Sequence, residues 1–154
     1  MSVFDELEFQ YNEIDQYYAK LEFEAGSHGL INEEKQYQQR RRINDQAYFL
    51  YMFSRLEDHI RVETAALIQR KQDSSLSWKV RTPWDILPKE PDSDDLSFKK
   101  RLSLLTEKGF GDFNLVSNYY EERNSIAHGG SFIKPISMPT VIINLKKLYI
   151  VLKS

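Results

Sequence analysis

The sequence predicts an all-α protein: a bundle of four to six helices with one long loop that contains Trp and Pro. Apolar residues recur at helical spacings of three and four, the stretch from Glu33 to Gln72 lacks Gly and Pro, and no segment offers a convincing pair of strands. With 154 residues the chain can bury a core without disulfides, so we expect a single domain over residues 1–154.

The opening segment is expected to form an amphipathic helix with one apolar stripe and a face of Glu and Gln. The sequence GSHG at Gly26–Gly29 should end this helix. Asn32, followed by two glutamates, is the predicted N-cap of the next helix. The predicted stripe consists of Phe4, Leu7, Tyr11, Ile14, Tyr18 and Leu21.

The stretch from Glu33 to Gln72 is rich in helix formers, with a polar first half, EEKQYQQRRR. Its second half, AYFLYMFSRLEDHIRVETAALI, is apolar nearly all round, as a central buried helix should be. The pattern predicts either one very long helix or two helices that meet near Ile43–Asp45.

Residues Gln72–Asp95 are predicted to be a loop, because they contain three prolines, a Ser pair and several Asp residues. Trp78 and Trp84 lie in this loop, and we expect them to anchor it to the body of the protein, with base stacking as an alternative role. The sequence DSDD then offers N-cap residues for a helix that should end at Gly109 and carry Leu96, Leu102 and Leu105.

A further helix is expected from Asn114 to the glycine pair Gly129–Gly130. The last segment, TVIINLKKLYIVL, contains β-branched residues that could favour a strand. Its apolar residues Ile142, Leu145 and Leu148 nevertheless keep helical spacing, so we predict a helix.

Composition excludes several classes of protein and site. The net charge of −2 gives no overall positive field, so nucleic acid could bind only through a local patch. The absence of cysteine excludes disulfides, thiol nucleophiles and cysteine-ligated zinc. The first residues are acidic, unlike a signal peptide, and the longest apolar run, AYFLYMF, is too short to span a bilayer. We therefore expect a cytoplasmic protein with no membrane partner.

The segment ERNSIAHGG, Glu122–Gly130, contains the main candidate site. Residues four apart share one face of a helix, which makes Asn124 and His128 neighbours. Arg123 and His128 are five apart and therefore about 140° apart around the axis, a separation that the long arginine side chain can bridge. The ordinary interpretation is a helix end, where the macrodipole favours a histidine.

Arg123-Asn124-Ser125-Ile126-Ala127-His128 resembles the R-x-x-x-x-H signature of HEPN-domain ribonucleases, including the polar residue after the arginine. The predicted all-α architecture and the place of the motif near the end of a late helix are similar too. An earlier long helix has an acidic residue, Glu57, in SRLEDHIR, where that family often has one.

The resemblance implies a metal-independent endoribonuclease without cofactors, in which Arg123 and His128 are catalytic and Asn124 and Glu57 support them. It also implies a homodimer with a composite active site, RNA as the substrate, a role as a toxin or anti-phage defence effector, and an antitoxin or inhibitor protein as a possible partner. One HEPN toxin subgroup reads R-x-x-x-x-H-x-Y, and here Gly130 stands at the tyrosine position.

Other candidate residues have simpler explanations beside functional ones. Arg40, Arg41 and Arg42 could contact RNA phosphate, or could form a solvated helix face, and they fan too widely for one flat patch. His28 is expected in a loop, and His59 in a polar contact of the core or dimer seam, with no metal-ligand spacing around it. Two alternatives to the ribonuclease remain: a catalytically silent HEPN-like module for dimerisation or RNA binding, and a helical adaptor for a protein partner.

Overall fold

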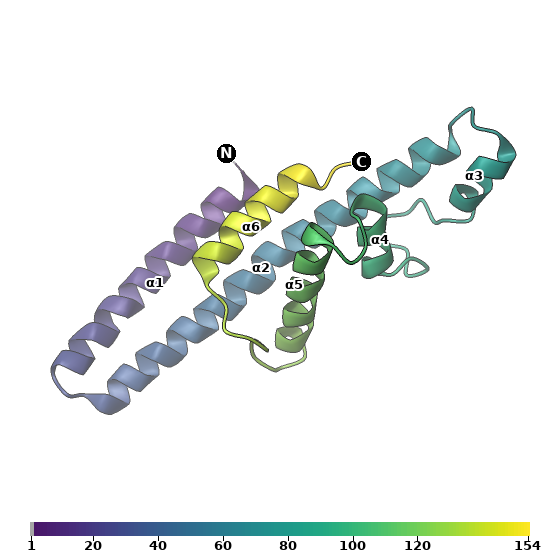
Figure 1. Ribbon diagram of the computed structural model, residues 1–154. Coiled ribbons are helices and arrows are strands. Elements are labelled where there is room, and N and C mark those ends of the chain that lie inside the picture. Colours follow the sequence, from purple (N-terminus) through teal and green to yellow (C-terminus); the bar gives the residue numbers. More distant parts are fainter. Residues whose placement is uncertain (1) are drawn as a thin grey trace. The chain divides into compact units, whose positions relative to one another are not determined.

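The computed structural model describes residues 2–154, and within them it contains six α-helices and no β-strand. The prediction of an all-α bundle of four to six helices is confirmed. No helix in this part of the chain combines the length and apolar character needed to cross a bilayer. The helices are α1 (Val3–Ser27), α2 (Ile31–Gln72), α3 (Trp78–Asp85), α4 (Phe98–Leu105), α5 (Gly111–Ala127) and α6 (Met138–Val151) (Figure 1).

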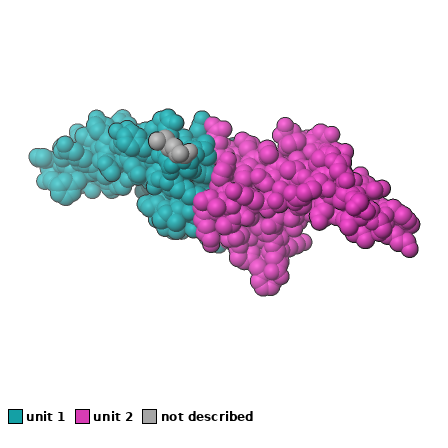
Figure 2. All heavy atoms as spheres, turned by 90° about the horizontal axis from the view of Figure 1, so that it is seen from above, with its two compact units in different colours: residues 1–53, 121–146 teal, residues 54–120, 147–154 magenta. Residues whose placement is uncertain are grey.

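The chain divides into two compact units, which Figure 2 shows in different colours. Unit 1 comprises residues 1–53 and 121–146, and unit 2 comprises residues 54–120 and 147–154. Helices α2, α5 and α6 therefore each contribute residues to both units. That residues 1–154 form a single domain stays a prediction.

In unit 1, α1 and the first part of α2 form an antiparallel hairpin (Figure 1). The Ser2 side chain accepts a hydrogen bond from the Phe4 amide at 3.2 Å, and the Asp5 carboxylate accepts one from the Ser2 amide at 2.6 Å. This reciprocal capping box satisfies two amides that would otherwise lack partners at the start of α1.

The predicted apolar stripe of α1 is buried at its start and more exposed further along. Phe4 and Tyr11 are buried, whereas Ile14 is 37% exposed and Tyr18 and Leu21 are half-buried. A helix that packs against a single partner helix covers only a narrow strip of its surface, so the later part of the stripe is less deeply buried.

The turn between α1 and α2 ends the first helix with a Schellman motif. Gly29 has φ +69°, and the Leu30 amide donates to the Ala25 carbonyl at 2.9 Å. His28 is the C-cap of α1, in agreement with its predicted place in a loop. The prediction that Asn32 caps α2 was wrong, because α2 begins at Ile31 and the Leu30 carbonyl already accepts the Glu34 amide at 2.9 Å.

Helix α2 is a single continuous helix, which settles the alternative of two helices meeting near Ile43–Asp45. In unit 1 its Phe49, Met52 and Phe53 are fully buried, and Phe132 packs edge-on against Phe49 at 5.3 Å between ring centres. The prediction that the last segment is a helix is confirmed. The part of α6 that belongs to unit 1 buries Met138, Val141, Ile142 and Leu145.

Unit 2 has its own apolar core, and a buried arginine stabilises the segment that precedes α4. The Arg101 guanidinium is fully buried and donates to the carbonyls of Leu96, Glu90 and Ser93, each at 3.1 Å, and to Thr64 Oγ1 at 3.5 Å. Burial lowers the pKa of Arg101 from its ordinary value. The core residues of unit 2 include Leu56, Ile60, Ile68, Leu96, Phe98, Leu102, Val116 and Leu148.

The segment Gln72–Asp95 is more ordered than the predicted loop, because it contains helix α3. Trp84 is half-buried, its carbonyl accepts a hydrogen bond from the side-chain Nε2 of Gln72 at 2.7 Å, and Lys71 Nζ lies 5.8 Å from the centre of its ring. Trp84 is therefore an anchor, as expected. Trp78 is 67% exposed, so the same expectation was wrong for Trp78.

The predicted ends of α4 also need correction. Ser97 rather than the DSDD segment occupies the N-cap of α4, and the helix ends at Leu105, four residues before Gly109. The Ser97 carbonyl already accepts the Arg101 amide at 3.0 Å, so the helical bonding starts after the acidic residues.

Candidate active site

The segment ERNSIAHGG forms the last turns of α5 and its C-terminal cap. The His128 amide donates to the Asn124 carbonyl at 3.1 Å, the Gly129 amide to Ile126 at 3.0 Å, and the Gly130 amide to Ser125 at 2.9 Å. Together with φ +83° at Gly129, these bonds define a Schellman motif with His128 at the C-cap. The glycine pair therefore ends the helix where the sequence predicts, immediately after the candidate histidine.

Arg123 and His128 both lie within reach of solvent in this last part of α5. Arg123 is half-buried and His128 is exposed. The Arg123 guanidinium donates from Nη1 to Asn124 Oδ1 at 3.0 Å, so the asparagine side chain restrains the arginine. The side chain of Asn124, the expected supporting residue, contacts Arg123, and its backbone carbonyl accepts the His128 amide. A supporting role for Asn124 in catalysis stays a prediction.

Glu122, which the sequence analysis did not single out, connects this helix end to the segment that follows it. The Glu122 side chain is buried, with 6% exposure, and its carboxylate accepts the Ile133 amide at 2.6 Å and the Lys134 amide at 3.1 Å. Ser125 Oγ donates to the Ser131 carbonyl at 2.7 Å. The connector between α5 and α6 comprises residues 128–137, and these contacts hold its residues 130–134 against the end of α5.

No short sequence motif indicates this role for Glu122. The only signal available in the sequence is an acidic residue one position before the arginine, which in most helices would face solvent. Its partners are backbone amides eleven and twelve positions further along. The sequence does not indicate these partners, because they come near Glu122 only after the chain reverses direction beyond α5.

Gly130 is required by close packing, whereas the positive φ at the helix end belongs to Gly129. A Cβ at this position would lie 2.8 Å from the Ser125 carbonyl oxygen and 3.0 Å from Ser125 Oγ. A tyrosine at position 130, as in the R-x-x-x-x-H-x-Y subgroup, would therefore require this turn to change. The local backbone at Gly130 therefore does not fit the tyrosine of that subgroup.

Glu57, the second supporting residue in the sequence analysis, lies on α2 in unit 2, whereas Arg123 and His128 lie in unit 1. The Glu57 side chain is buried, and its Oε1 accepts a hydrogen bond from Arg61 Nη2 at 3.0 Å, one helical turn away. A supporting role for Glu57 in catalysis stays a prediction.

The three consecutive arginines of α2 have different surroundings. Arg41 is held by Asp15 and Glu22 of α1, each at 2.9 Å, and these two carboxylates raise its pKa. Arg40 is exposed and lies over the rings of Tyr18 and Tyr37. Arg42 is also exposed. Arg41 therefore bridges α1 and α2, and contact of the three arginines with RNA stays a prediction.

Beside Arg41, a polar network joins α1 and α2. Tyr11 Oη donates to Asp45 Oδ1 at 2.8 Å. Burial is the main cause that raises the pKa of Asp45, and burial followed by the Asp45 hydrogen bond raises the pKa of Tyr11. Tyr11, Asp15, Arg41 and Asp45 all line a polar cavity of about 250 Å³. Arg41, the cation of this network, is already paired with Asp15 and Glu22. The network therefore stabilises the contact between α1 and α2.

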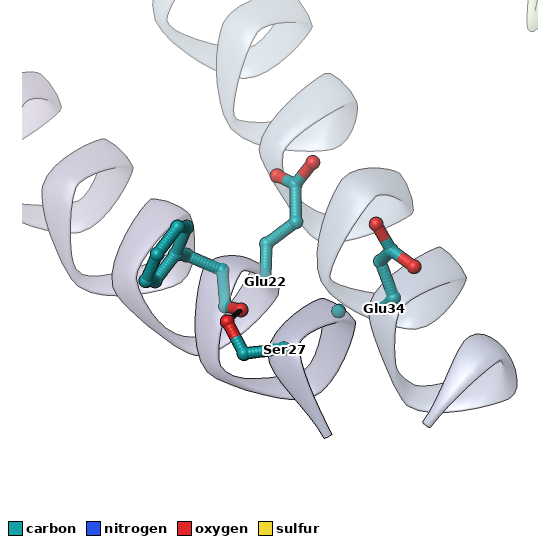
Figure 3. Close-up of a pocket in the computed structure, with 5 residues that line it drawn as sticks. Glu22, Ser27 and Glu34 are labelled. Carbon is teal, nitrogen blue, oxygen red and sulfur yellow. Dashed lines mark hydrogen bonds between the residues drawn. The ribbon is translucent and has the colours of Figure 1, made fainter. Parts of the chain in front are cut away.

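A larger surface pocket of about 430 Å³ lies near the turn of the same hairpin (Figure 3). Glu22 of α1 and Glu34 of α2 line it from the two helices, together with Ser27. Phe23 and Gly26 complete the lining, and a Cβ at Gly26 would lie 3.1 Å from Glu34 Oε1. The Glu22 carboxylate is already engaged by Arg41, so two free carboxylates do not face each other here.

His59 lies in unit 2, where it contacts the C-terminal part of the chain. Its Nε2 is 2.7 Å from the Leu152 carbonyl, and its ring stacks on Tyr149 with 4.1 Å between ring centres. His59 therefore makes a polar contact in a part-buried position, and its place at a dimer seam stays a prediction. Among residues 2–154, no group of three or more His, Asp or Glu side chains is arranged to hold a metal ion.

Comparison with known proteins gives no relative for this chain: no family model, no curated protein and no solved structure matches it.

Proposed function

We propose that this protein is a metal-independent endoribonuclease of the HEPN type, in which Arg123 and His128 act on the RNA backbone. The observation that supports the proposal is that the C-terminal end of α5 and its cap carry both a guanidinium and an imidazole within reach of solvent, with Arg123 half-buried and bonded to Asn124 and His128 exposed at the C-cap. The Glu122 carboxylate, through its two hydrogen bonds to backbone amides, holds the connector beside this end of α5.

The chemistry of RNA cleavage needs the groups that this turn offers. A base removes the proton of the ribose 2′-OH, and the 2′ oxygen attacks the adjacent phosphorus. The bond from phosphorus to the 5′ oxygen then breaks, and an acid protonates that oxygen, so that the products are a 2′,3′-cyclic phosphate and a 5′-OH. A histidine titrates near neutral pH and can serve as base or acid. The Arg123 guanidinium can donate paired hydrogen bonds to the charge that gathers on the phosphoryl oxygens.

One motif contains one histidine, whereas the reaction uses both a base and an acid. We infer that two copies of the chain form a homodimer and bring two His128 side chains to a composite site around a twofold axis. Activity should then depend on both copies. When wild-type and His128→Ala chains are mixed and allowed to exchange, activity should fall as the square of the wild-type fraction. A linear fall would show that one chain suffices.

The central test is cleavage of total tRNA by purified protein in the presence of a chelator, with end-group analysis of the products. His128→Ala and Arg123→Ala should each lower the rate by about 10²–10⁴-fold, since each removes an acid–base group or an electrostatic stabiliser. Both variants should keep the wild-type circular dichroism spectrum, because both side chains reach solvent.

The chain itself provides a matched control for the histidine. His28 is also the C-cap of a helix that ends in a Schellman motif, but Phe23 stands five residues before it in place of an arginine. His28→Ala should therefore leave cleavage unchanged. Absence of cleavage by the wild type, or equal cleavage by the Arg123→Ala/His128→Ala double variant, contradicts the proposal and favours a silent RNA-binding module or a protein adaptor.

A ribonuclease of this kind would suit a toxin or an anti-phage effector that an antitoxin or inhibitor protein restrains. Induced synthesis of the wild-type chain in a bacterial host should then arrest growth, whereas synthesis of the His128→Ala chain should not. Equal growth of both strains, with equal protein levels, would contradict the role as a toxin or effector, but it would not test the cleavage chemistry.

A further inference from the structure

Three tyrosines and one arginine of unit 1 gather on the α1–α2 hairpin, and we call them the Tyr–Arg cluster: Tyr17, Tyr18, Tyr37 and Arg40. The Arg40 guanidinium carbon lies 5.6 Å from the centre of the Tyr18 ring and 5.9 Å from that of Tyr37. The rings of Tyr18 and Tyr37 are 6.3 Å apart, and Tyr17 meets Tyr18 edge-on at 5.5 Å.

The surrounding salt bridges hold the two helices of the cluster in register. Arg41, adjacent to Arg40, bonds to Asp15 on one side of the α1 tyrosines and to Glu22 on the other. Since Asp15 and Glu22 flank Tyr17 and Tyr18 in the sequence, these bonds fix α1 against α2 where the rings meet. The cluster is thus organised before any ligand arrives, which lowers the entropic cost of binding.

Packing between the helices explains only half of the cluster. Tyr18 and Tyr37 are half-buried and fill the space between α1 and α2. Tyr17, by contrast, is 61% exposed, and Arg40 is exposed too. The Tyr17 ring and the Arg40 guanidinium each contact Tyr18 and each reach solvent, so they offer two planar surfaces on which flat groups can stack.

We propose that the Tyr–Arg cluster is a stacking site for the bases of single-stranded RNA. A nucleotide matches it because its base is flat and can stack on Tyr17 or on the Arg40 guanidinium, while its phosphate carries the charge that Arg40 attracts. A protein partner would have to supply these two features from separate side chains. The choice of RNA rests on the proposed ribonuclease function, whereas binding at this cluster can be measured separately from cleavage.

The three consecutive arginines of α2, Arg40, Arg41 and Arg42, differ in their relation to the cluster. By helical geometry, Arg42 projects about 200° around the axis of α2 from Arg40. Arg41 is occupied by carboxylates. Arg40 is therefore the arginine that belongs to this site, and Arg42→Ala is the matched control, because it removes the same charge from the opposite side of the same helix.

The experiment measures fluorescence anisotropy of a labelled twelve-nucleotide oligoadenylate RNA, with the His128→Ala protein as background so that the probe is not consumed. Tyr17→Leu and Arg40→Ala should each weaken binding about fivefold to a hundredfold, the range expected for loss of one stacked base. Arg40→Ala should also reduce the slope of log affinity against log salt by about 0.7. Tyr17→Phe, which keeps the ring, and Arg42→Ala should bind as the background protein does.

Several outcomes would overturn the stacking site. These are a probe that does not bind, equal weakening by Arg40→Ala and Arg42→Ala, or equal affinity of the Tyr17→Leu and Tyr17→Phe proteins. The last result would also be expected if the cluster served a protein partner. If the wild-type protein cleaves RNA but the His128→Ala background protein does not bind the probe, only this site is refuted. Probe binding that depends on the cluster, in a protein that never cleaves RNA, refutes only the proposed enzyme.

Discussion

Replacement of Glu122 by alanine tests how the candidate active site is held together. The wild-type carboxylate accepts two backbone amides, those of Ile133 at 2.6 Å and Lys134 at 3.1 Å, from a buried position. A hydrogen bond to a charged group contributes about 1.5–3 kcal/mol. Ile133 is 60% exposed and Lys134 is exposed, so water can replace part of what the two amides lose.

We therefore expect Glu122→Ala to lower the free energy of unfolding by about 2–3 kcal/mol, near the lower limit for two such bonds. In urea this corresponds to a midpoint lower by roughly 1–2 M. Glu122→Gln should lose about half as much, because its amide oxygen can still accept one bond while its NH₂ group meets the other donor.

Hydrogen exchange gives the decisive measurement, because it reports on the connector itself. The Ile133 and Lys134 amides lie in a segment outside the helices, so their protection should depend on the Glu122 carboxylate and should be lost in Glu122→Ala. Glu13→Gln, which removes an exposed carboxylate from the middle of α1, should leave both stability and these amides unchanged. If the two amides of Glu122→Ala exchange at the wild-type rate, the carboxylate does not hold the connector and the reasoning is wrong.

Three further predictions concern single positions. Gly130→Ala should cost about 1–3 kcal/mol, since its Cβ would meet the Ser125 carbonyl oxygen at 2.8 Å; an unchanged thermal midpoint would show that the turn can shift freely. Arg101→Met should cost about 2–4 kcal/mol in urea unfolding, because buried carbonyls lose their donors; equal stability would mean that the cost of burying the cation cancels these bonds. The folded-state pKa of Asp45 is raised by burial, so its protonated form favours folding, and wild-type stability from this group falls as pH rises above about 4 through the raised pKa. Asp45→Asn, which can still accept from Tyr11, should abolish that fall, and a pH profile of unfolding identical to that of the wild type would refute the assignment.

The C-terminal ends of α1 and α5 were predictable from the sequence, because local signals fix them. Helix α3, the start of α5 at Gly111 and the end of α4 at Leu105 were not predicted. The positive-φ glycines Gly29 and Gly129 end α1 and α5 close to the predicted positions, and the helical spacing of Ile142, Leu145 and Leu148 identified the buried face of α6. Where several residues could cap a helix, the prediction failed, as at the starts of α2 and α4. Competing capping residues within one short segment differ by about 1 kcal/mol, and tertiary contacts decide between them.

In the candidate site too, local features could be predicted from the sequence, whereas contacts between distant residues could not. The sequence by itself determined that Arg123, Asn124 and His128 share the end of one helix, since helix-forming residues precede them and two glycines follow. Only the tertiary structure decided that Glu122 turns inward to two amides of the connector, that Arg41 pairs with two carboxylates while Arg40 lies over two tyrosine rings, and that Arg101 is buried among carbonyls. The physical reason is that a helix needs only neighbouring residues to form, whereas a polar side chain is stabilised by whichever donor or acceptor the folded chain brings to it from a distant part of the sequence.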